Sequence, residues 1–396
     1  MRIHAPEITR TNGNVRVSAR IETEARLPHL PETLWYKFPE EFEGMIFHGL
    51  EPFLIPLVPC AMNIVEAIDV PGDISPRLLF HLERYQQMYH YWEPRSFAPI
   101  PIRHAGSRGS DPLVNPARAK PVGMMFSGGV DSFHTLHRNL PGNQPVPEYQ
   151  ITHGIYLFGF DLQEHERASY AKSLARYQRL FADLHLTLIP LEFNARQFWR
   201  GGTQLENRHW QAKTFGAGLA GAGHVLGGGL GKLYMASSQL FNHGEFMGSE
   251  MRLDQSLSTE WLEIIHDGLV EDRTRKTVAL ADWPATYDAL RVCWWNPDGV
   301  QNCGQCPKCV RTMTTLEALG KLGHYSVFPK PYRPRLILQR LATIAGSAYL
   351  RDMRAIARKN GRWDLVIPLW IAGWIANIRA ALKRFARVFN PAFEGW

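Results

Sequence analysis

The stretch MMFSGGVDSFHTL, residues 124–136, contains the pattern that decides the fold. An apolar run leads into two glycines, meets an aspartate between small polar residues and then becomes helix-like in composition. The apolar run predicts a buried strand over 122–126, and the residues after it predict a helix from Ser132 to about Asn139. A strand that leads directly into a helix places free backbone N–H groups at the carboxyl edge of a sheet, where phosphates bind in open α/β proteins.

The sequence that follows this stretch alternates between strand-like and helix-like segments. Apolar runs predict strands over 154–160, 186–193 and 232–238. An amphipathic pattern predicts a helix over 164–184, and a Gly- and Ala-rich segment predicts another over about 205–227. Successive βα units imply a parallel sheet with helices on both faces, so residues 122–325 are expected to form one α/β domain.

The first 105 residues predict a small α+β domain. Residues 14–22 alternate apolar and polar side chains as a half-buried strand does, and 34–38 and 98–104 are further short strands. Ser75 followed by Pro76 marks the start of a helix. Such a domain is expected to act as a cap or an oligomerisation element. Residues 106–121 are rich in Gly, Ser, Pro and charge and predict a linker.

The residue types in SGGVDS suit a loop that holds phosphate groups. Gly128 and Gly129 let the backbone approach phosphate oxygens, and the hydroxyl groups of Ser127 and Ser132 can donate hydrogen bonds. A carboxylate beside phosphates repels them, so Asp131 is expected to hold a metal ion such as Mg²⁺ or to orient a donor. The residues assigned to the nucleotide are Phe126, Ser127, Gly128, Gly129, Val130, Asp131 and Ser132, and Asp131 and Ser132 are also assigned to catalysis.

This loop differs from two common phosphate-binding motifs. It lacks the G-x-G-x-x-G spacing of dinucleotide-binding proteins and the G-K-[ST] ending of the Walker loop. The missing lysine argues against transfer of a γ-phosphoryl group. The alternative interpretation is a glycine-containing βα turn that binds no ligand.

Four of the five cysteines fall within 17 positions, at the spacing C-x9-C-x2-C-x2-C. They are Cys293, Cys303, Cys306 and Cys309. Two-residue gaps let neighbouring thiolates turn toward one ion, and four thiolates complete the tetrahedral shell of a structural zinc site. An iron–sulfur cluster or a redox role is the alternative. A cytoplasmic location is expected from this cysteine usage and from the polar residues 1–10.

The loop resembles the PP-loop of the ATP pyrophosphatase superfamily, over roughly residues 120–325. The resemblance implies an adenine-nucleotide α-hydrolase-like fold and cleavage of ATP to AMP and pyrophosphate, through adenylation of a carboxylate, amide or carbonyl oxygen. The later CGQCPKC stretch is similar to the zinc site of 7-cyano-7-deazaguanine synthases, which activate a deazaguanine carboxylate and use ammonia to form a nitrile. This chain departs from them by its N-terminal domain and its C-terminal tail of about 70 residues, which implies action on another acid.

Further candidates follow from their positions in the chain. The segment 266–280 lies where related enzymes have a basic residue that reaches the pyrophosphate, which assigns Arg275 to nucleotide binding and Lys276 to catalysis, with Arg273 as a third candidate. The alternative is a charged helix face. Ser237 follows a predicted strand at the expected cleft edge and is assigned to the nucleotide; Asp161 has a similar position. Residues 242–268 carry His and acidic side chains and are expected to form a loop over the site rather than a second metal site.

The formal net charge of +7 is concentrated at the C-terminal end. Residues 326–396 contain 13 Lys/Arg and 3 Asp/Glu, a net charge of +10, so the rest of the chain carries +7 − 10 = −3. The tail includes LVIPLWIAGWIANIRAALKRFARVF, residues 365–389, whose apolar part is interrupted by Pro368. This composition predicts a basic helical tail that lies in an anionic membrane interface or meets an acidic partner or RNA; an ordinary packed helix is the alternative.

These observations lead to three functional hypotheses. The first is an enzyme that uses ATP to adenylate a carboxylate for attack by ammonia or an amine, with ATP, Mg²⁺ and Zn²⁺ as cofactors. The second is a tRNA thiolation enzyme of the same superfamily, although no cysteine is left near the loop if the four bind zinc. The third is a membrane-associated regulator that binds nucleotide without turnover.

Overall fold

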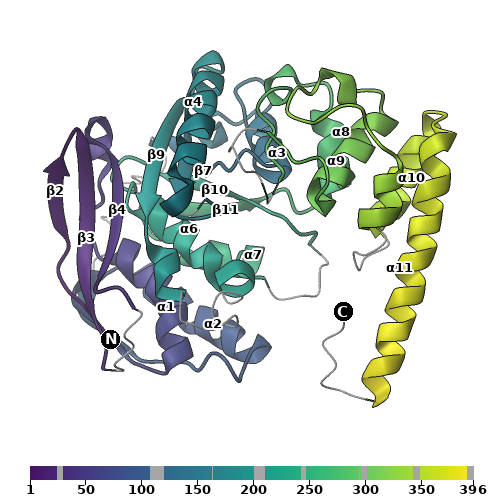
Figure 1. Cartoon of the computed structure of the whole chain (residues 1–396). Helices are drawn as coiled ribbons and strands as arrows, with labels where there is room; N and C mark the ends of the chain where they lie inside the picture. Colours follow the sequence, from purple (N-terminus) through teal and green to yellow (C-terminus); the bar gives the residue numbers. More distant parts are fainter. Residues whose placement is uncertain are drawn as a thin grey trace. The chain divides into compact units, whose positions relative to one another are not determined.

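The computed structural model describes residues 1–24, 30–107, 120–162, 164–199, 210–241, 247–293, 295, 301–341 and 348–389 (Figure 1). The chain forms two compact units. Unit 1 comprises Met1–Ser127 and Thr135–Leu269, and unit 2 comprises Gly128–His134 and Val270–Trp396. The SGGVDS stretch therefore crosses from unit 1 into unit 2 between Ser127 and Gly128.

Five parallel strands form one half of the sheet in unit 1. They are β7 (Val122–Met125), β8 (His153–Phe158), β9 (Thr187–Phe193), β10 (Lys232–Ala236) and β11 (Glu263–Asp267). Their spatial order is β11-β10-β7-β8-β9, and every neighbouring pair is parallel. Numbered along the chain, this order is 3-2-1-4-5, as in doubly wound α/β proteins. The predicted α/β class is confirmed, and β11 is a strand that the sequence patterns did not predict.

Aromatic packing attaches α4 (Arg167–Asp183) to this half of the sheet. The rings of Tyr177 and Phe181 meet the ring of Phe126 edge-on, with centroids 5.1 and 5.0 Å away. Tyr177 also packs against Tyr156 of β8 at 4.9 Å. All four side chains are buried, so the apolar face predicted for 164–184 is the face that covers the strand leading into the loop.

The Gly- and Ala-rich segment forms α6 (Phe215–His224), preceded by a π-helical turn over Trp210–Thr214. The predicted helix over 205–227 was longer, and its residues 205–209 lie outside the described part of the chain. The small residues permit close approach to α1 (Glu51–Ile64): a Cβ atom at Gly221 would lie 2.8 Å from the hydroxyl of Tyr36 and 2.9 Å from the carbonyl oxygen of Pro52. Short side chains on α6 are therefore a packing requirement.

The N-terminal region contributes the other half of the sheet. Its elements are β1 (Arg2–Ile3), β2 (Glu7–Thr11), β3 (Asn14–Glu22), β4 (Thr33–Pro39), α1 (Glu51–Ile64), β5 (Ile68–Ile74), α2 (Pro76–Trp92) and β6 (Ile102–Ser107). The sheet has 11 strands and continues from β9 through β4, β3, β1 and β5 to β6, with β2 paired to β3. The predicted N-cap is confirmed, because the Leu78 N–H donates to the Ser75 hydroxyl at 2.9 Å.

This continuity differs from the predicted division into domains 1–105, 122–325 and 326–396. Strand β4 pairs antiparallel with β9, where Tyr36 lies opposite Phe193, and one hydrophobic core includes side chains from both halves of the sheet. The N-terminal region and the parallel strands therefore belong to one compact unit. The pairing joins segments about 150 residues apart in sequence, which local patterns do not reveal.

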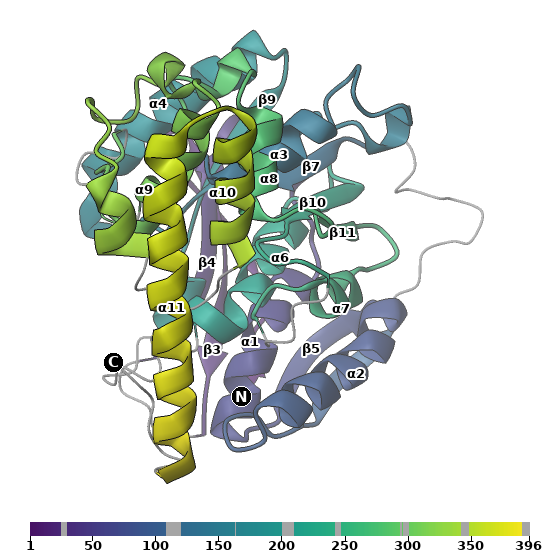
Figure 2. The same cartoon turned by 90° about the vertical axis from the view of Figure 1, so that its right-hand side faces the viewer.

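The described part of unit 2 consists of helices and the loops between them. It contains part of α3 (Val130–Arg138), α8 (Arg273–Leu280), α9 (Pro307–Ala318), α10 (Ala348–Lys359) and α11 (Trp363–Phe389). Helices α10 and α11 lie side by side, joined by a short turn (Figure 2). Buried side chains of α9, α10 and α11 share a second hydrophobic core. The predicted helical tail is therefore part of the same unit as α8 and α9.

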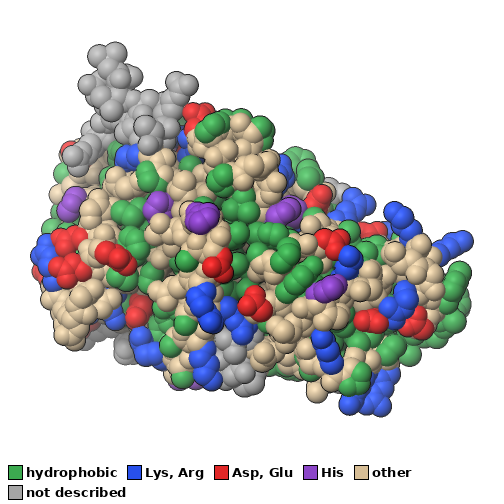
Figure 3. All heavy atoms as spheres, turned by 90° about the horizontal axis from the view of Figure 1, so that it is seen from above, with side chains coloured by type: hydrophobic (Ala, Val, Ile, Leu, Met, Phe, Trp, Pro, Cys, Tyr) green, Lys and Arg blue, Asp and Glu red, His purple; other side chains and the backbone are tan. Residues whose placement is uncertain are grey.

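The surface carries charges of both signs. Figure 3 shows acidic and basic side chains interspersed with apolar ones on one face of the molecule. A group of several basic side chains without an acidic neighbour would therefore differ from the mixed charges seen on this face.

Candidate functional site

The first half of the SGGVDS loop continues from a buried strand of unit 1. The N–H of Phe126 donates to the carbonyl oxygen of Ile155 at 2.9 Å, which extends the pairing with β8 by one residue. The buried Phe126 ring is fixed by α4. Ser127 then leaves the strand, and Gly128 has φ +75°, a conformation that side chains with a Cβ rarely adopt. The sharp exit from the strand explains why a glycine stands at 128.

Strand β7 occupies a special place in the order of the sheet. The strands that follow it along the chain first extend the sheet on its β8 side and then on its β10 side. In open α/β sheets, ligands bind outside the carboxyl ends of the strands at such a reversal. Ser127 follows β7 and Ser237 follows β10, so both lie at this edge of unit 1. The Ser237 N–H donates to the carbonyl oxygen of Asp267 at 2.7 Å. The Ser237 hydroxyl donates to the carbonyl oxygen of Gln239 at the same distance.

The second half of the loop starts helix α3 in unit 2. The Gly129 carbonyl oxygen accepts hydrogen bonds from the N–H of Phe133 at 2.9 Å and from the hydroxyl of Ser132 at 3.0 Å. The Gly128 carbonyl oxygen accepts from the N–H of Arg291 at 2.7 Å. Val130 and Ser132 are buried. Hydrogen bonds thus fix the turn that carries Asp131.

Asp131 faces two basic side chains of α8 within unit 2. Its Oδ2 accepts a hydrogen bond from Arg273 Nε at 2.8 Å, and its Oδ1 lies 3.4 Å from Lys276 Nζ. Burial by itself raises the pKa of the Asp131 carboxyl, but the charges of Arg273 and Lys276 outweigh it and hold this pKa below its usual value. Both carboxylate oxygens therefore engage cations. Of the two expectations for Asp131, this arrangement agrees better with orienting a donor than with holding Mg²⁺.

The basic residues of helix α8 lie on different sides of the helix. The Asp272 carboxylate accepts from the Arg275 N–H at 2.9 Å and so caps the helix at its first turn. From this start, Arg273 and Lys276 are three residues apart and share a face, whereas Arg275 is exposed. Lys276 is almost fully buried, with 1% of its surface exposed. The three predicted candidates thus have different environments, and Asp131 contacts Arg273 and Lys276.

Arg311 of α9 is a candidate that the sequence did not bring forward. Desolvation and the nearby charge of Arg273 together lower its pKa to about 10, although the charges of Asp131 and Asp272 act in the opposite direction. Its guanidinium carbon lies 5.6 Å from the centre of the Tyr349 ring. Among the residues that the structure describes, no carboxylate forms an ion pair with it. A partly buried cation with no carboxylate at ion-pair distance suits an anionic ligand. Its position two residues after Cys309 was the signal that could have identified it.

The four cysteines meet in unit 2, where each offers a sulfur atom within 4.8 Å of the others. The sulfur of Cys306 lies 3.3 Å from that of Cys309 and 4.0 Å from that of Cys293, and the Cys303–Cys309 separation is 3.8 Å. A tetrahedral ion with metal–sulfur bonds of about 2.3 Å requires sulfur–sulfur distances of about 3.8 Å. The predicted cluster is confirmed, and it could hold a metal ion such as zinc.

Backbone groups support these sulfur atoms. The Cys306 N–H donates to the sulfur of Cys303 at 3.2 Å, and the Trp295 N–H donates to that of Cys293 at the same distance. Cys306 is the N-cap of α9, and its sulfur accepts from the Cys309 N–H at 3.5 Å. The hydrogen bond from Cys306 raises the pKa of the Cys293 thiol to about 12. A bound divalent cation would stabilise the thiolate forms, which gives the cluster a chemical reason to take up metal.

The acidic and histidine residues of 247–268 have protein partners. Asp254 Oδ2 lies 2.7 Å from both His266 Nδ1 and the Ser249 hydroxyl, and Glu260 accepts from the Arg77 N–H at 2.9 Å. His243 and Glu245 lie outside the described residues. Among described side chains, the four cysteines are the group whose ligand atoms come together as a metal site requires. Asp161 is exposed in the segment after β8.

One helix in the described part of the chain is long and apolar enough to cross a membrane, over Trp363–Leu382 of α11. A single helix of this kind is weak evidence for a membrane protein, because helices of soluble proteins meet the same criteria. Its Leu365, Leu369, Ala372 and Ala376 are buried in the core that α11 shares with α9 and α10.

Comparisons of the chain with protein-family models, with curated proteins and with solved structures found no match.

Proposed function

We propose that the chain is an ATP-dependent enzyme that forms AMP and pyrophosphate by adenylating a carboxylate, which ammonia or an amine then attacks. The observation that carries this proposal is the SGGVDS segment at the carboxyl end of β7, the strand at which the 3-2-1-4-5 parallel sheet reverses its order. The short loop, the left-handed Gly128 and the start of α3 suit the binding of phosphate groups. The fold would then be that of the PP-loop ATP pyrophosphatases.

The proposed reaction has two steps. A carboxylate oxygen of the acid attacks the α-phosphorus of ATP, the bond to the oxygen bridging the α- and β-phosphates breaks, and pyrophosphate leaves. The nitrogen of ammonia or an amine then attacks the acyl carbon, AMP leaves with the electron pair of the acyl–oxygen bond, and the nitrogen loses a proton. The protein's task in both steps is to position the reactants and to stabilise the charge of the leaving group.

The cations of unit 2 supply a means of stabilising pyrophosphate. Arg273 and Lys276 carry two positive charges against the single charge of Asp131, and Arg311 adds a third. In this proposal Asp131 orients the side chains of α8, and Arg311 contributes the cation that has no carboxylate partner among the described residues. Charge that develops on the leaving group would be stabilised by these fixed donors without reorganisation. Mg²⁺ would arrive with ATP, as it does in most reactions of nucleoside triphosphates.

We propose zinc as the ion held by Cys293, Cys303, Cys306 and Cys309, because four thiolates with these separations form a closed shell. Such an ion would be structural, since no coordination position remains for substrate. The resemblance to 7-cyano-7-deazaguanine synthases favours a planar heterocyclic acid as substrate, with ammonia or an amine as the nitrogen donor.

The tRNA thiolation alternative is less well supported by the placement of the cysteines. All five lie in the described part of the chain; four form the metal cluster and Cys60 is buried within α1. Burial raises the pKa of Cys60 to about 12, so this thiol is a poor sulfur carrier.

The experiment that tests the proposal measures the products of α-labelled ATP. The protein is incubated with Mg²⁺ and candidate acids, including 7-carboxy-7-deazaguanine, with and without ammonia. AMP that depends on one acid would support the proposal and identify the substrate class. ADP would contradict it, because γ-phosphoryl transfer would then be the chemistry.

Two arginine variants make this test specific. Arg311→Ala should lower the rate of AMP formation by about 100-fold, the usual effect of removing one preorganised donor. Arg179→Ala is the control, since Arg179 is exposed on α4 and has no role in the proposed reaction, and it should stay close to wild type. Equal losses in both variants would refute the role given to Arg311.

A further inference from the structure

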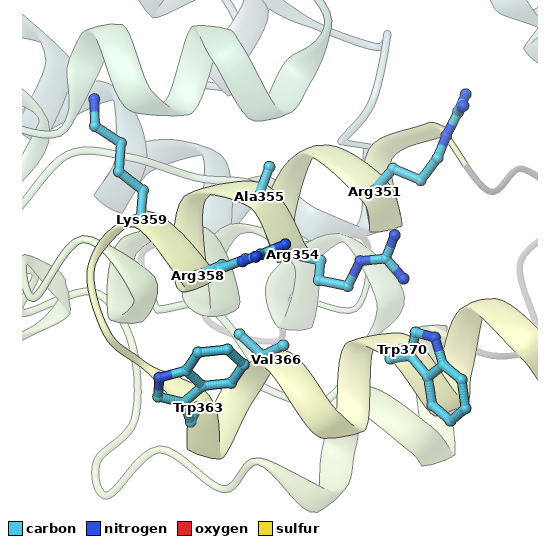
Figure 4. Close-up of a pocket in the computed structure, with 8 residues that line it drawn as sticks. All are labelled: Arg351, Arg354, Ala355, Arg358, Lys359, Trp363, Val366 and Trp370. Atoms are coloured by element: carbon cyan, nitrogen blue, oxygen red, sulfur yellow. The ribbon is translucent and has the colours of Figure 1, made fainter.

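The strongest unexplained feature of unit 2 is a basic cavity between α10 and α11. It has a volume of about 700 Å³ and is lined by Arg351, Arg354, Arg358 and Lys359 of α10 and by Trp363 and Trp370 of α11. Figure 4 shows Arg354 and Arg358 in the middle of the group, with the two tryptophan rings beside them and Arg351 and Lys359 toward its ends. Among the described residues, the cavity lining contains four cations and no carboxylate.

Asp352 lies near Arg351, but among the described residues the other three cations have no carboxylate partner. No ion pair among the described residues involves Arg354, Arg358 or Lys359. Like charges in one cavity repel, so such a group is stable when an anion or an anionic surface approaches it. The cavity therefore suits a phosphate-containing ligand.

An apolar stripe on α11 runs along the edge of the same cavity. Its exposed members are Trp363, Ile367, Trp370, Trp374, Ile378, Leu382 and Phe385, each between 48% and 65% exposed. Their spacing of three and four residues places them on one face of the helix over about 33 Å. Soluble proteins rarely leave a continuous apolar stripe of this length uncovered.

The opposite face of α11 is already covered by protein. Leu365, Leu369, Ala372 and Ala376 are buried against α9 and α10. A helix with one face in a protein core and the other apolar and exposed is suited to lie in the plane of a membrane interface rather than to cross the bilayer. Tryptophan rings favour this depth, because one end of the indole is apolar and the other can donate a hydrogen bond.

We infer that the α10–α11 hairpin docks on an anionic phospholipid bilayer, with α11 in the interface and lipid phosphate groups in the basic cavity. Charge complementarity selects the anionic surface, and the adjacent aliphatic and tryptophan side chains select a lipid surface over RNA, whose phosphates offer nothing for Ile367, Ile378 and Leu382 to contact. This inference does not depend on the proposed reaction.

Flotation of the full chain with vesicles tests the inference. Vesicles of phosphatidylcholine with about 30 mol% phosphatidylglycerol are compared with phosphatidylcholine alone, at low and high salt. The double variant Arg354→Glu/Arg358→Glu should lower the partition coefficient for the anionic vesicles by about 30-fold or more, because each basic side chain near such a surface contributes roughly a fivefold factor. The matched control is Lys172→Glu/Arg179→Glu, which changes the net charge equally at exposed positions of α4 and should bind as wild type does.

A second pair of variants separates the apolar contribution from the charge. Trp370→Ser/Trp374→Ser should lose binding, whereas Trp370→Phe/Trp374→Phe should retain most of it, since aromatic surface is preserved. In wild type, lipids brominated near the headgroup should quench tryptophan fluorescence more strongly than lipids brominated near the bilayer centre. This last measurement needs no variant and remains decisive if a variant folds poorly.

Several results would overturn the inference. Equal binding of wild type to anionic and neutral vesicles, or equal losses in the α10 and α4 variants, would remove the role of the cavity. Stronger quenching from the bilayer centre would indicate a spanning helix. Binding to a single-stranded RNA that falls in the α10 variant, without binding to vesicles, would assign the cavity to nucleic acid.

Discussion

Replacement of Asp131 by Asn should destabilise unit 2 in a manner that depends on pH. The amide keeps the shape of the carboxylate but removes the charge that faces Arg273 Nε at 2.8 Å and Lys276 Nζ at 3.4 Å. The Asp131 side chain is 17% exposed and that of Lys276 only 2%. Solvent therefore cannot stabilise the buried ammonium group of Lys276 once the negative charge of Asp131 is removed.

The expected magnitude follows from these contacts. A hydrogen bond between charged groups contributes about 1.5–3 kcal/mol, and breaking a fully buried ion pair costs about 3–5 kcal/mol. The Lys276 contact is long and the Arg273 side chain is 28% exposed, so both values are reduced. Asp131→Asn is therefore expected to lower the free energy of unfolding by about 2–4 kcal/mol at pH 7.

The sign of the pH dependence follows from the lowered pKa of Asp131. A carboxyl group with a depressed pKa in the folded state contributes stability that is fully present above its unfolded pKa, about 3.9, and is lost as the pH falls through the folded value. The asparagine variant has no such contribution at any pH. The difference between wild type and variant should therefore be full at pH 7 and shrink below about pH 4.

Urea unfolding followed by circular dichroism, with the metal kept saturating, measures this difference at several pH values. Asp282→Asn is the control, because Asp282 pairs with Lys321 while its side chain is 75% exposed, and no measurable change is expected. A difference between wild type and Asp131→Asn that stays constant from pH 7 to pH 3 would refute the electrostatic explanation. A loss equal to that of Asp282→Asn would show that the cluster around Asp131 is not coupled to folding.

Three further predictions concern other groups. Lys276→Met should change stability by less than about 1.5 kcal/mol, because Arg273 still faces Asp131 and methionine fits a similar volume, yet it should lower the rate of AMP formation by about 100-fold in the labelled-ATP assay. Chelation of the zinc proposed for the cysteine cluster should lower both the melting temperature and the affinity for pyrophosphate, as calorimetry would record; retention of pyrophosphate binding would contradict this. Burial lowers the pKa of His224 to about 4, so stability should fall by about 3 kcal/mol as the pH drops from about 6.5 to 4. His224→Gln should flatten that slope in urea titrations.

Local sequence patterns predicted most of the elements near the loop. The four strands β7, β8, β9 and β10 are apolar runs with clear ends, and their positions agree with prediction within about two residues. Strand β5 was missed because Pro71 and Gly72 interrupt it; the structure accommodates them through a register shift between Val70 and Asp73. The β4–β9 pairing was missed for a different reason, since long-range pairing has no local signature.

The candidate site shows the same division between local and non-local information. The two-residue gaps in CGQCPKC predicted that the cysteines would meet, because short spacing restricts where the thiols can point. Distinguishing the environment of Arg275 from those of Arg273 and Lys276 requires knowing which residues of α8 share a face. The cap at Asp272 sets where the helix begins, and this was not evident from HDGLVEDRTRK. Arg311 required knowledge of which charged groups surround it, which depends on the packing of α9 among its neighbours.

The cysteine cluster and the proposed anion site are joined through the start of α9. Cys306 caps this helix and Cys309 lies in its first turn, so a metal held by both sulfur atoms would fix the position and direction of that turn. Arg311 follows two residues later on the same helix, and its guanidinium carbon lies 5.6 Å from the centre of the Tyr349 ring. A closed structural metal site would in this way set the geometry of the cation proposed to meet the leaving group, without touching the substrate. Loss of the metal would then let Arg311 move before the protein unfolds. Measuring pyrophosphate affinity together with melting temperature therefore distinguishes a metal site that positions Arg311 from one that only stabilises the fold.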